Sequence, residues 1–378
     1  MTLSQSLPLQ AERFQDQQCH PFFSGLLPEG QLRRLIAQQC AVSGDNDFAL
    51  LEAIGGDCAG AVSLWPEGGE ALGSNPAGVD WLEPQQLVTL LEELPRRPML
   101  AGADGLRLSL AGAQDKLPVI VDGERIGLPR GHQPSTHILK PAIAAVDDSV
   151  HNEAFCMALL KSMGMRAADT RILMVEEQAI LLVSRYDRCE SGDGRWVRLH
   201  QEDFCQALGV MPELKYQNEG GPDLAACFAL IRRSTRPSAP QVLQLLDAAI
   251  VNAMLGNHDA HAKNFSLLYT DKATVLPPLY DVLCTAVYPA LTPKMAMKVG
   301  SNYKFSELHR RHWEQFAEAA GLSKAQAKKR VLQITKKLSA KAHQVRASEG
   351  FCRRPIIDKI VKLIDERAAL THKRLAGS

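Results

Sequence analysis

The hydrophobic pattern of the first hundred residues is mainly helical. Apolar residues recur at helical spacing in three segments, which predict helices at 30–40, 45–58 and 83–94. The first 30 residues carry three prolines and no such periodicity, so we expect them to form a loop.

From residue 106 the period changes to two. Apolar and polar residues alternate in LRLSLAG, KLPVIVDGERIGLP and STHILKP, with breaks at Asp-Gly and Pro. Alternation with turn residues is typical of short antiparallel strands. We expect an amphipathic helix over 152–164 and a hairpin over 170–188 to complete this β-rich region.

After Asp187 the helical period returns. Helices are expected at 201–208, 222–232, 240–256, 306–320, 323–345 and 356–374, with a polar hairpin over 264–281. The order of elements predicts an α+β protein with two lobes, a β-rich N-lobe over 1–186 and a mainly helical C-lobe over 187–378. Such a layout places a ligand in the crevice between the lobes.

Composition narrows the class of protein. The chain is 46% hydrophobic and 22% charged, as expected of a soluble globular protein, and no apolar run approaches the roughly 20 residues of a membrane span. The N-terminus lacks the pattern of a secretory signal. The nine cysteines are scattered without a CxxC pair, which favours reduced thiols in the cytoplasm over a zinc framework.

Charge is distributed unevenly along the chain. Residues 1–320 hold 28 Lys or Arg and 38 Asp or Glu, whereas residues 321–378 hold 15 and 4. The basic C-terminal helices indicate either a solvated face or a surface close to nucleic acid or an acidic partner.

The chemistry is concentrated in GNHDAHAKN (256–264), directly after a predicted buried helix. Asp259 and Asn264 are five residues apart, and Asp281 follows Asn264 by 17 residues, beyond the hairpin. Phosphoryl transfer needs a carboxylate that orients the attacking hydroxyl, an amide oxygen for Mg²⁺ and a second carboxylate for the metal. This spacing supplies all three, in the order found in protein kinases.

The β-rich region supplies the other groups that a kinase needs. SLAGAQDK (109–116) carries Gly112 between small residues, where backbone N–H groups can approach phosphates. Lys140 ends the predicted strand HILK, and Glu153 follows in the first turn of a helix, so the two can form the ion pair that fixes a phosphate-binding lysine. Taken alone, SLAGAQDK is also typical of a β-turn. Lys140 and Glu153, each taken alone, are typical of charges on a solvated surface.

Two other interpretations of GNHDAHAKN remain open. His258, Asp259 and His261 are candidate ligands of a metal-dependent phosphohydrolase, which would need further ligands from His151, His200 or His309. Alternatively, these polar residues only cap helix ends.

Eight segments form a series along the chain. In order they are SLAGAQDK, STHILKP, NEAFC, SRYDR, HQEDFCQALG, GGPDLA, GNHDAHAKNFSLLY and PLYD. The series resembles the HipA family of bacterial serine/threonine kinases, the toxins of HipBA-type toxin–antitoxin modules, and the match extends from about Phe22 to the C-terminus. The resemblance implies a protein-kinase-like fold and a serine/threonine-protein kinase that uses ATP and Mg²⁺.

The resemblance also implies roles at the matching positions. Asp259 would be the catalytic base, Asn264 and Asp281 the Mg²⁺ ligands, and Lys140 the ligand of the ATP phosphates. His261 and Tyr280 would lie near the nucleotide. The adenine would be received by a hinge that includes Val183, Arg185 and Tyr186, and the phosphates by Ser109, Leu110, Ala111, Gly112, Ala113, Gln114 and Lys116.

Ser109 matches the serine that such kinases autophosphorylate, after which the loop leaves the ATP site. A phosphate of about −1.5 to −2 charge beside the bound triphosphate would disfavour the closed loop. Adenine contacts are in question at one position, because Ser184 replaces the glutamate usual before the RFDR-like segment.

The resemblance extends to partners. FFSGLLPEG starts at residue 22, whereas full-length members have a further β-rich region before it, so the chain looks like the shortened HipT type. This type implies a helix-turn-helix (HipB-like) antitoxin, a small HipS-like protein, and DNA reached only through the antitoxin. The protein substrate would be an aminoacyl-tRNA synthetase or another translation-related protein. A catalytically silent, kinase-like corepressor scaffold is the alternative from a different class.

Overall fold

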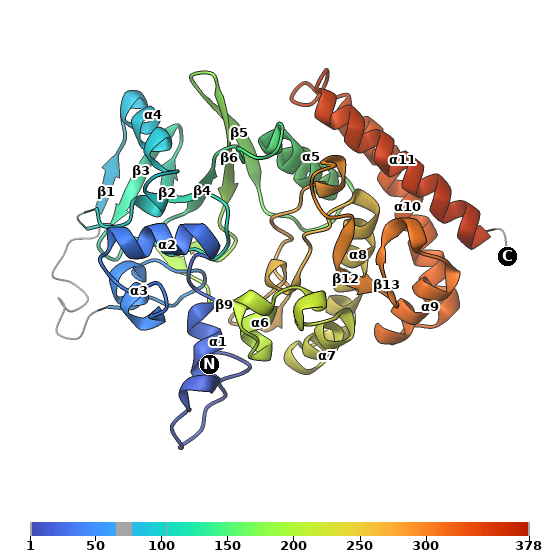
Figure 1. Ribbon diagram of the computed structural model, residues 1–378, viewed down its shortest axis with the longest axis horizontal. Coiled ribbons are helices and arrows are strands. Elements are labelled where there is room, and N and C mark those ends of the chain that lie inside the picture. Colours follow the sequence, from blue (N-terminus) through green and yellow to red (C-terminus); the bar gives the residue numbers. More distant parts are fainter. Residues whose placement is uncertain (1, 66–77, 104, 377–378) are drawn as a thin grey trace. The chain divides into compact units, whose positions relative to one another are not determined.

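The computed structural model describes residues 2–65, 78–103 and 105–376 (Figure 1). It contains both helices and sheets, so the α+β class is confirmed. The chain forms two compact units. Unit 1 comprises Met1–Ile143, Ala168–Glu202 and Leu268–Thr270, and unit 2 comprises Ala144–Ala167, Asp203–Leu267 and Asp271–Ser378. The boundary expected at 186/187 therefore lies inside a segment of unit 1, and the helix expected at 152–164 belongs to unit 2.

Unit 1 is built on a six-stranded antiparallel sheet with the order β1-β3-β2-β4-β6-β5. The strands are β1 (Gly78–Trp81), β2 (Leu117–Asp122), β3 (Arg125–Arg130), β4 (His137–Lys140), β5 (Thr170–Val175) and β6 (Gln178–Ser184). Asp122 pairs with Arg125, so Gly123 and Glu124 form the two-residue turn predicted from Asp-Gly. Both expected hairpins of this region are confirmed, and β1 was not predicted.

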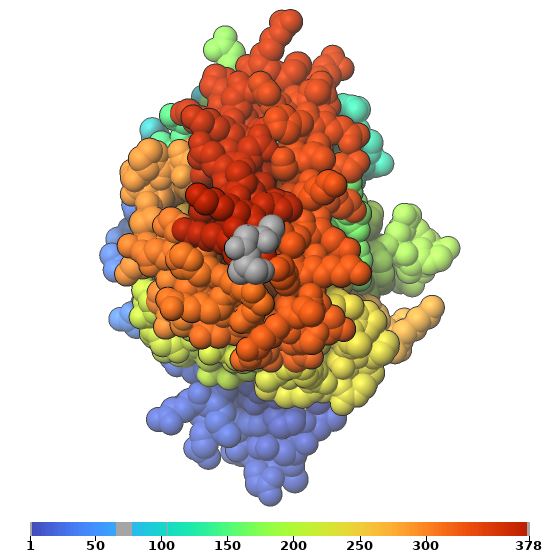
Figure 2. Space-filling model, turned by 90° about the vertical axis from the view of Figure 1, so that its right-hand side faces the viewer, coloured from blue at the N-terminus to red at the C-terminus, as the bar shows by residue number. Residues whose placement is uncertain are grey.

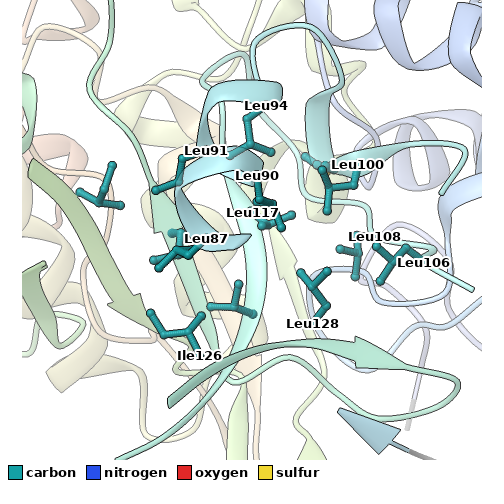
Figure 3. Close-up of a cluster of buried hydrophobic side chains, with 14 of the residues drawn as sticks. Leu87, Leu90, Leu91, Leu94, Leu100, Leu106, Leu108, Leu117, Ile126 and Leu128 are labelled. Carbon is teal, nitrogen blue, oxygen red and sulfur yellow. The ribbon is translucent and has the colours of Figure 1, made fainter. Parts of the chain in front are cut away.

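One helix covers this sheet with an apolar face. α4 (Pro84–Glu93) contributes Leu87, Leu90 and Leu91, whose spacing places them on one side of the helix. They belong to a buried cluster that includes Leu117 of β2 and Leu128 of β3 (Figure 3). The sheet that carries the expected phosphate-binding lysine is thus fixed by burial of apolar surface.

The remaining helices of unit 1 share a second core. α1 (Asp16–Ser24), α2 (Gly30–Gln39) and α3 (Asp47–Ile54) bury Phe22, Ile36, Leu50, Leu51 and Ile54 together. The prediction of a loop over the first 30 residues was wrong for α1. Its sequence is mostly polar and contains Pro21, so it lacks the apolar spacing that indicates a helix.

The strand expected over 106–112 was also wrong. Only isolated bridges form there, Leu108 with Asp57 and Gly112 with Pro28. Alternation makes a chain extended and half-buried, but a strand also requires a continuous ladder of backbone hydrogen bonds with a neighbour.

Unit 2 is mainly helical, as predicted. Its helices are α5 (Ser149–Ser162), α6 (Phe204–Leu208), α7 (Leu224–Ser234), α8 (Ser238–Leu255), α9 (Arg310–Ala319), α10 (Lys324–Arg346) and α11 (Pro355–Ala376). α10 packs against α11, α5, α8 and α9, and the outer surface of α10 and α11, orange to red, faces the viewer in Figure 2. None of the described helices has the length and apolar content of a bilayer span.

Short elements complete the chain. β9 (Gln201–Asp203), β10 (Ser266–Tyr269) and β11 (Thr274–Val275) form one sheet, β7 (Arg188–Glu190) pairs with β8 (Trp196–Arg198), and β12 (Lys294–Val299) pairs with β13 (Asn302–Lys304). The 3-10 helices are η1 (Pro98–Leu100), η2 (Pro212–Leu214), η3 (Gln217–Glu219), η4 (Ala262–Asn264), η5 (Thr285–Val287) and η6 (Phe305–Glu307). The hairpin expected over 264–281 is present as β10 and β11. The helix expected over 201–208 forms only from Phe204 as α6, because residues 201–203 form the strand β9.

Candidate active site

The candidate catalytic loop begins where α8 ends. Gly256 has a φ of +85°, and a Cβ there would lie 2.7 Å from Ala286 Cβ and 2.8 Å from Leu363 Cδ2. The backbone N–H groups of Gly256 and Asn257 both donate to Asn252 O at 3.0 Å. Only glycine satisfies the left-handed conformation and the close approach together, so the loop leaves a fixed helix end.

Two asparagines shape this loop. Asn257 Oδ1 accepts a hydrogen bond from the backbone N–H of Asp259 at 3.1 Å. Asn264 Nδ2 donates to Asp259 O at 2.9 Å, so the residues of the D-x₄-N spacing meet in one closed turn. Because this bond fixes the amide, its oxygen is the remaining acceptor of the Asn264 side chain, and amide oxygens are suitable Mg²⁺ ligands.

His258 has both ring nitrogens engaged. Nδ1 lies 3.0 Å from Thr292 O, which can only accept, and Nε2 lies 3.1 Å from Arg367 Nη2, which can only donate. Burial lowers the pKa of His258 and Arg367 acts in the same direction, while the bond to Thr292 opposes them. His258 is therefore a neutral residue that shapes the loop, and its ring has no nitrogen left for a metal.

Asp259 is the exposed carboxylate of the loop. Its side chain is 43% exposed, whereas that of His261 is 6% exposed. His261 Nε2 lies 3.9 Å from Asp259 Oδ1, and the Tyr216 hydroxyl donates a hydrogen bond to the same oxygen. A carboxylate that is oriented by its neighbours and open to solvent can accept a proton from a substrate hydroxyl.

Lys263, which lies inside the loop, is not available to a ligand in this conformation. Its ammonium group lies 2.8 Å from Asp203 Oδ2, and both side chains are buried. Asp203 Oδ1 also accepts from Gln206 N at 2.9 Å, which caps α6. The pair fastens the catalytic loop to the start of α6.

Tyr280 ties the approach to Asp281 to the same loop. Its hydroxyl donates to Lys263 O at 2.9 Å and lies 2.6 Å from Ser266 Oγ. Asp281 follows directly and has a φ of +57°. This left-handed conformation costs a non-glycine residue about 1 kcal/mol and is often found at functional sites.

In unit 1, the expected phosphate loop is held closed. Ser109 is 0% exposed, and its hydroxyl donates to Leu26 O at 2.9 Å. Gly112 has a φ of +111°, and a Cβ there would lie 2.7 Å from Lys116 Nζ. The ammonium group of Lys116 in turn donates to Ala111 O, so a hydrogen bond connects the two ends of the loop. Gln114 Nε2 reaches Pro141 O at 3.4 Å.

Lys140 and Glu153 belong to different units. Lys140 ends β4 in unit 1, and Glu153 lies on α5 in unit 2; both are buried. Their ion pair stays a prediction.

The expected hinge leads into a buried ionic cluster. Val183 pairs with Ile138 in the sheet, and the backbone N–H of Arg185 donates to Thr136 O at 2.9 Å. The Arg185 guanidinium lies 2.8 Å from Asp187 Oδ2, and burial of this group is outweighed by Asp187 and Asp57, which raise the pKa of Arg185. A nucleotide contact of Arg185 would therefore come from its carbonyl oxygen.

The ionic cluster is buried next to the end of β6. Asp57 accepts from Arg188 Nη2 at 2.9 Å and from Arg198 Nε at 3.1 Å, and Arg188 Nη1 lies 3.0 Å from Asp187 Oδ2. The hydroxyl of Tyr186 donates to Gln201 Oε1, and Gln201 Nε2 donates to Asp187 Oδ2 at 3.3 Å. Buried charge pairs of SRYDR thus fix the chain after β6, where the hinge is expected.

Sequence reasoning missed three residues at this site. Tyr216 and Asp203 touch the catalytic loop, and Arg367 of α11 lies 2.5 Å from Ala253 O as well as near His258. Burial lowers the pKa of Arg367 to about 10, so it stays charged at neutral pH. Asp203 lies within HQEDFCQALG, one of the segments of the family series, and no local pattern marks the other two.

Comparison with known proteins identifies the family. Residues 1–65 match the family model of the HipA N-terminal domain, and residues 108–342 match that of the HipA-like C-terminal domain. The candidate kinase Y4mE of Sinorhizobium fredii is 48% identical over 338 residues, which are 88% of this chain and 80% of the relative. The chain belongs to the HipA family.

Two further matches, both to HipA of Shewanella oneidensis, support this result. The serine/threonine-protein kinase toxin HipA of Shewanella oneidensis is 29% identical over 85% of this chain and 75% of its own length. A HipA structure from that organism, solved with HipB and operator DNA, matches 100% of this chain and 89% of its own with a TM-score of 0.85 and 26% identity. The kinase-like, HipA-like fold is thereby confirmed, and the shortened HipT type stays a prediction.

The structure gives little support to a transition-metal site. Within residues 2–65, 78–103 and 105–376, no three His, Cys, Asp or Glu side chains are placed to hold a metal ion together. His151, one of the possible further ligands, is buried against Asp148, to which its Nδ1 bonds. The oxygen donors Asn264 and Asp281 instead suit Mg²⁺ bound jointly with phosphate oxygens.

Proposed function

We propose that this HipA family member is an ATP- and Mg²⁺-dependent serine/threonine-protein kinase that acts as the toxin of a toxin–antitoxin system. The observation that carries the proposal is the closed turn in which Asn264 bonds Asp259 O while the Asp259 carboxylate remains 43% exposed. The identity to named kinases of the family supports the same reaction.

In this mechanism Asp259 orients the hydroxyl of the protein substrate and takes its proton. The hydroxyl oxygen forms a bond to the γ-phosphorus of ATP while the bond to the ADP oxygen breaks. Asn264 and Asp281 would hold Mg²⁺, which neutralises charge on the phosphates when bound. Lys140 would bind the phosphates, and the backbone around Gly112 would approach them.

The test is transfer of labelled γ-phosphate by the purified protein. Asp259→Asn and Asp281→Asn are expected to abolish labelling and growth inhibition on expression. Asp271→Asn is the matched control, because Asp271 is exposed between β10 and β11. Labelling that persists in both site variants would refute the kinase. Stoichiometric Fe, Mn or Zn with phosphatase activity would favour the phosphohydrolase instead.

Autophosphorylation at Ser109 belongs to the same proposal. Ser109 is 0% exposed and bonded to Leu26 O, so the loop must open before the hydroxyl can react. Phosphate would then prevent the loop from closing again, because a dianion cannot be buried where a neutral hydroxyl was. Mass spectrometry should find phosphate at Ser109 in the active protein and none in Asp259→Asn, while Ser109→Ala should retain transfer to other substrates.

The proposal extends to partners and substrate. A HipB-like helix-turn-helix antitoxin is supported by the HipA structure solved with HipB and operator DNA. A small HipS-like protein and an aminoacyl-tRNA synthetase substrate rest on the family resemblance. The exposed Lys329, Lys336 and Lys359 on α10 and α11 offer a basic surface to an acidic partner. Co-purification with an antitoxin encoded beside this chain would test the first partner.

A further inference from the structure

Tyr216 contacts the candidate catalytic base from a separate segment of unit 2. Its hydroxyl donates a hydrogen bond to Asp259 Oδ1, and its ring meets that of His261 edge to face, with centroids 5.1 Å apart. His261 Nε2 lies 3.9 Å from the same carboxylate oxygen. Tyr216 and His261 therefore both act on one side of the Asp259 carboxylate.

The segment that carries Tyr216 is anchored to the catalytic loop by one strand. On β12, the backbone N–H of Ala296 donates to His258 O at 2.8 Å, and that of Lys298 donates to Gln217 Oε1 at 2.7 Å. The two anchors are two residues apart on β12, whose pairing with β13 shifts register between Lys294 and Val299. β12 thus holds both the segment that carries Tyr216 and the catalytic loop.

The turn after Tyr216 is also closely packed. The backbone N–H groups of Glu219 and Gly221 donate to Tyr216 O at 3.0 and 2.9 Å. A Cβ on Gly221 would lie 2.0 Å from Leu214 O and 2.8 Å from Tyr216 O, so the turn closes on itself only with glycine at this position. A side chain on a turn held in this way has a defined position and is suited to orient a neighbour.

We propose that Tyr216 is a positioning residue for phosphoryl transfer, which holds the Asp259 carboxylate in the orientation that accepts the proton of the substrate hydroxyl. The inference rests on the proposed kinase function. Tyr216 bonds Oδ1, and the 43% exposure of the Asp259 side chain shows that the carboxylate remains open to a substrate. This exposure distinguishes positioning from blocking, because a blocking residue would bury the group that it covers.

The test is Tyr216→Phe, which removes the hydroxyl and keeps the ring beside His261. We expect kcat near neutral pH to fall by about tenfold and KM for ATP to stay within about twofold, because the lost bond orients the base and not the nucleotide.

Tyr303→Phe is the matched control. Tyr303 lies on β13 with its ring 4.9 Å from Lys298 Nζ, so this variant also loses a tyrosine hydroxyl in unit 2 and should behave as the unmodified protein. Tyr216 is only half-buried, so Tyr216→Phe is expected to melt within about 2 °C of the unmodified protein. Tyr216→Leu, which also removes the ring, should lower kcat at least as far.

The outcomes separate the two proposals. If neither the unmodified protein nor Tyr303→Phe transfers phosphate, the proposed function fails. If both are active and Tyr216→Phe has the same kcat, the positioning role fails while the kinase stands. A rise in kcat would also overturn it, since Tyr216 would then obstruct Asp259.

Discussion

Asp57→Asn would remove one of the two carboxylates from the buried cluster behind the hinge. The Asp57 side chain is 4% exposed and accepts from Ser135 Oγ at 2.5 Å and from Arg188 Nη2 at 2.9 Å. Arg185 and Arg198 also lie within 3.4 Å of its oxygens. An asparagine of nearly the same shape would keep one acceptor. Arg185 and Arg188 would then have only the Asp187 carboxylate, and Arg198 would lose the carboxylate that it contacts.

The expected loss follows from this arrangement. Removing one partner of a buried ion pair costs about 3–5 kcal/mol, because the remaining charge is left without compensation in a low-dielectric interior. For a unit of about 150–250 residues, 1 kcal/mol corresponds to about 2–4 °C in the melting temperature. We therefore expect unit 1 of Asp57→Asn to melt about 6–20 °C below that of the unmodified protein.

Acid titration gives a second signature. Burial alone would raise the pKa of Asp57, but Arg185, Arg188 and Arg198 outweigh it and lower the pKa below its usual value. A carboxylate with a lowered pKa stabilises the fold above its unfolded pKa and loses that contribution as pH falls through the folded pKa. The unmodified protein should lose stability below about pH 4, and Asp57→Asn should lose less there.

The assay is thermal unfolding by circular dichroism at pH 7 and through the acid range. Asp80→Asn is the control, since Asp80 forms a surface pair with Arg130 in the same unit at 2.5 Å and its side chain is 50% exposed. Such pairs contribute about 0–1 kcal/mol. Equal melting temperatures for Asp57→Asn and Asp80→Asn would refute the reasoning, because burial of the charges would then have no energetic consequence.

Two predictions concern the helix ends around the catalytic loop. In a denaturant titration, Gly256→Ala should destabilise unit 2 by about 2–4 kcal/mol, because it adds a contact of 2.7 Å with Ala286 to the cost of a left-handed backbone. Gly164→Ala is the control: Gly164 has a φ of +78° with nothing within 4 Å of the new Cβ, so this variant should lose only about 1 kcal/mol. Arg367→Leu should cost about 2–4 kcal/mol and reduce phosphate transfer, because the Ala253 carbonyl and His258 lose their buried donor. Lys362→Ala on the same helix, where the lysine is 79% exposed, should change neither, and an active, fully stable Arg367→Leu would contradict the positioning of His258 by α11.

Much of the local structure follows from the sequence. The helices of unit 2, the Asp-Gly hairpin of β2 and β3, and the loop at the end of α8 each depend on residues close together in the chain. Apolar periodicity, a turn dipeptide and a helix-ending glycine are local signals that act on the backbone directly. The spacing of Asp259 and Asn264 is local in the same way, and their contact within one turn was predictable for that reason.

The failures have an equally physical cause. Residues 106–112 alternate like a strand but lack a neighbour to complete a ladder, and α1 forms although Pro21 interrupts its pattern, because Phe22 buries itself in a shared core. Whether a segment finds a partner is decided by chain segments far away in sequence, which a local pattern does not contain.

The sequence by itself determined the family motifs, the fold class and the order of the candidate catalytic groups. Only the tertiary structure brought Tyr216 to Asp259, Arg367 to His258 and the arginines after the hinge to Asp57. These contacts join residues 43, 109 and 131 positions apart. Packing of whole helices and strands sets such distances, and a buried charge or hydroxyl finds its partner only once that packing has excluded water around it.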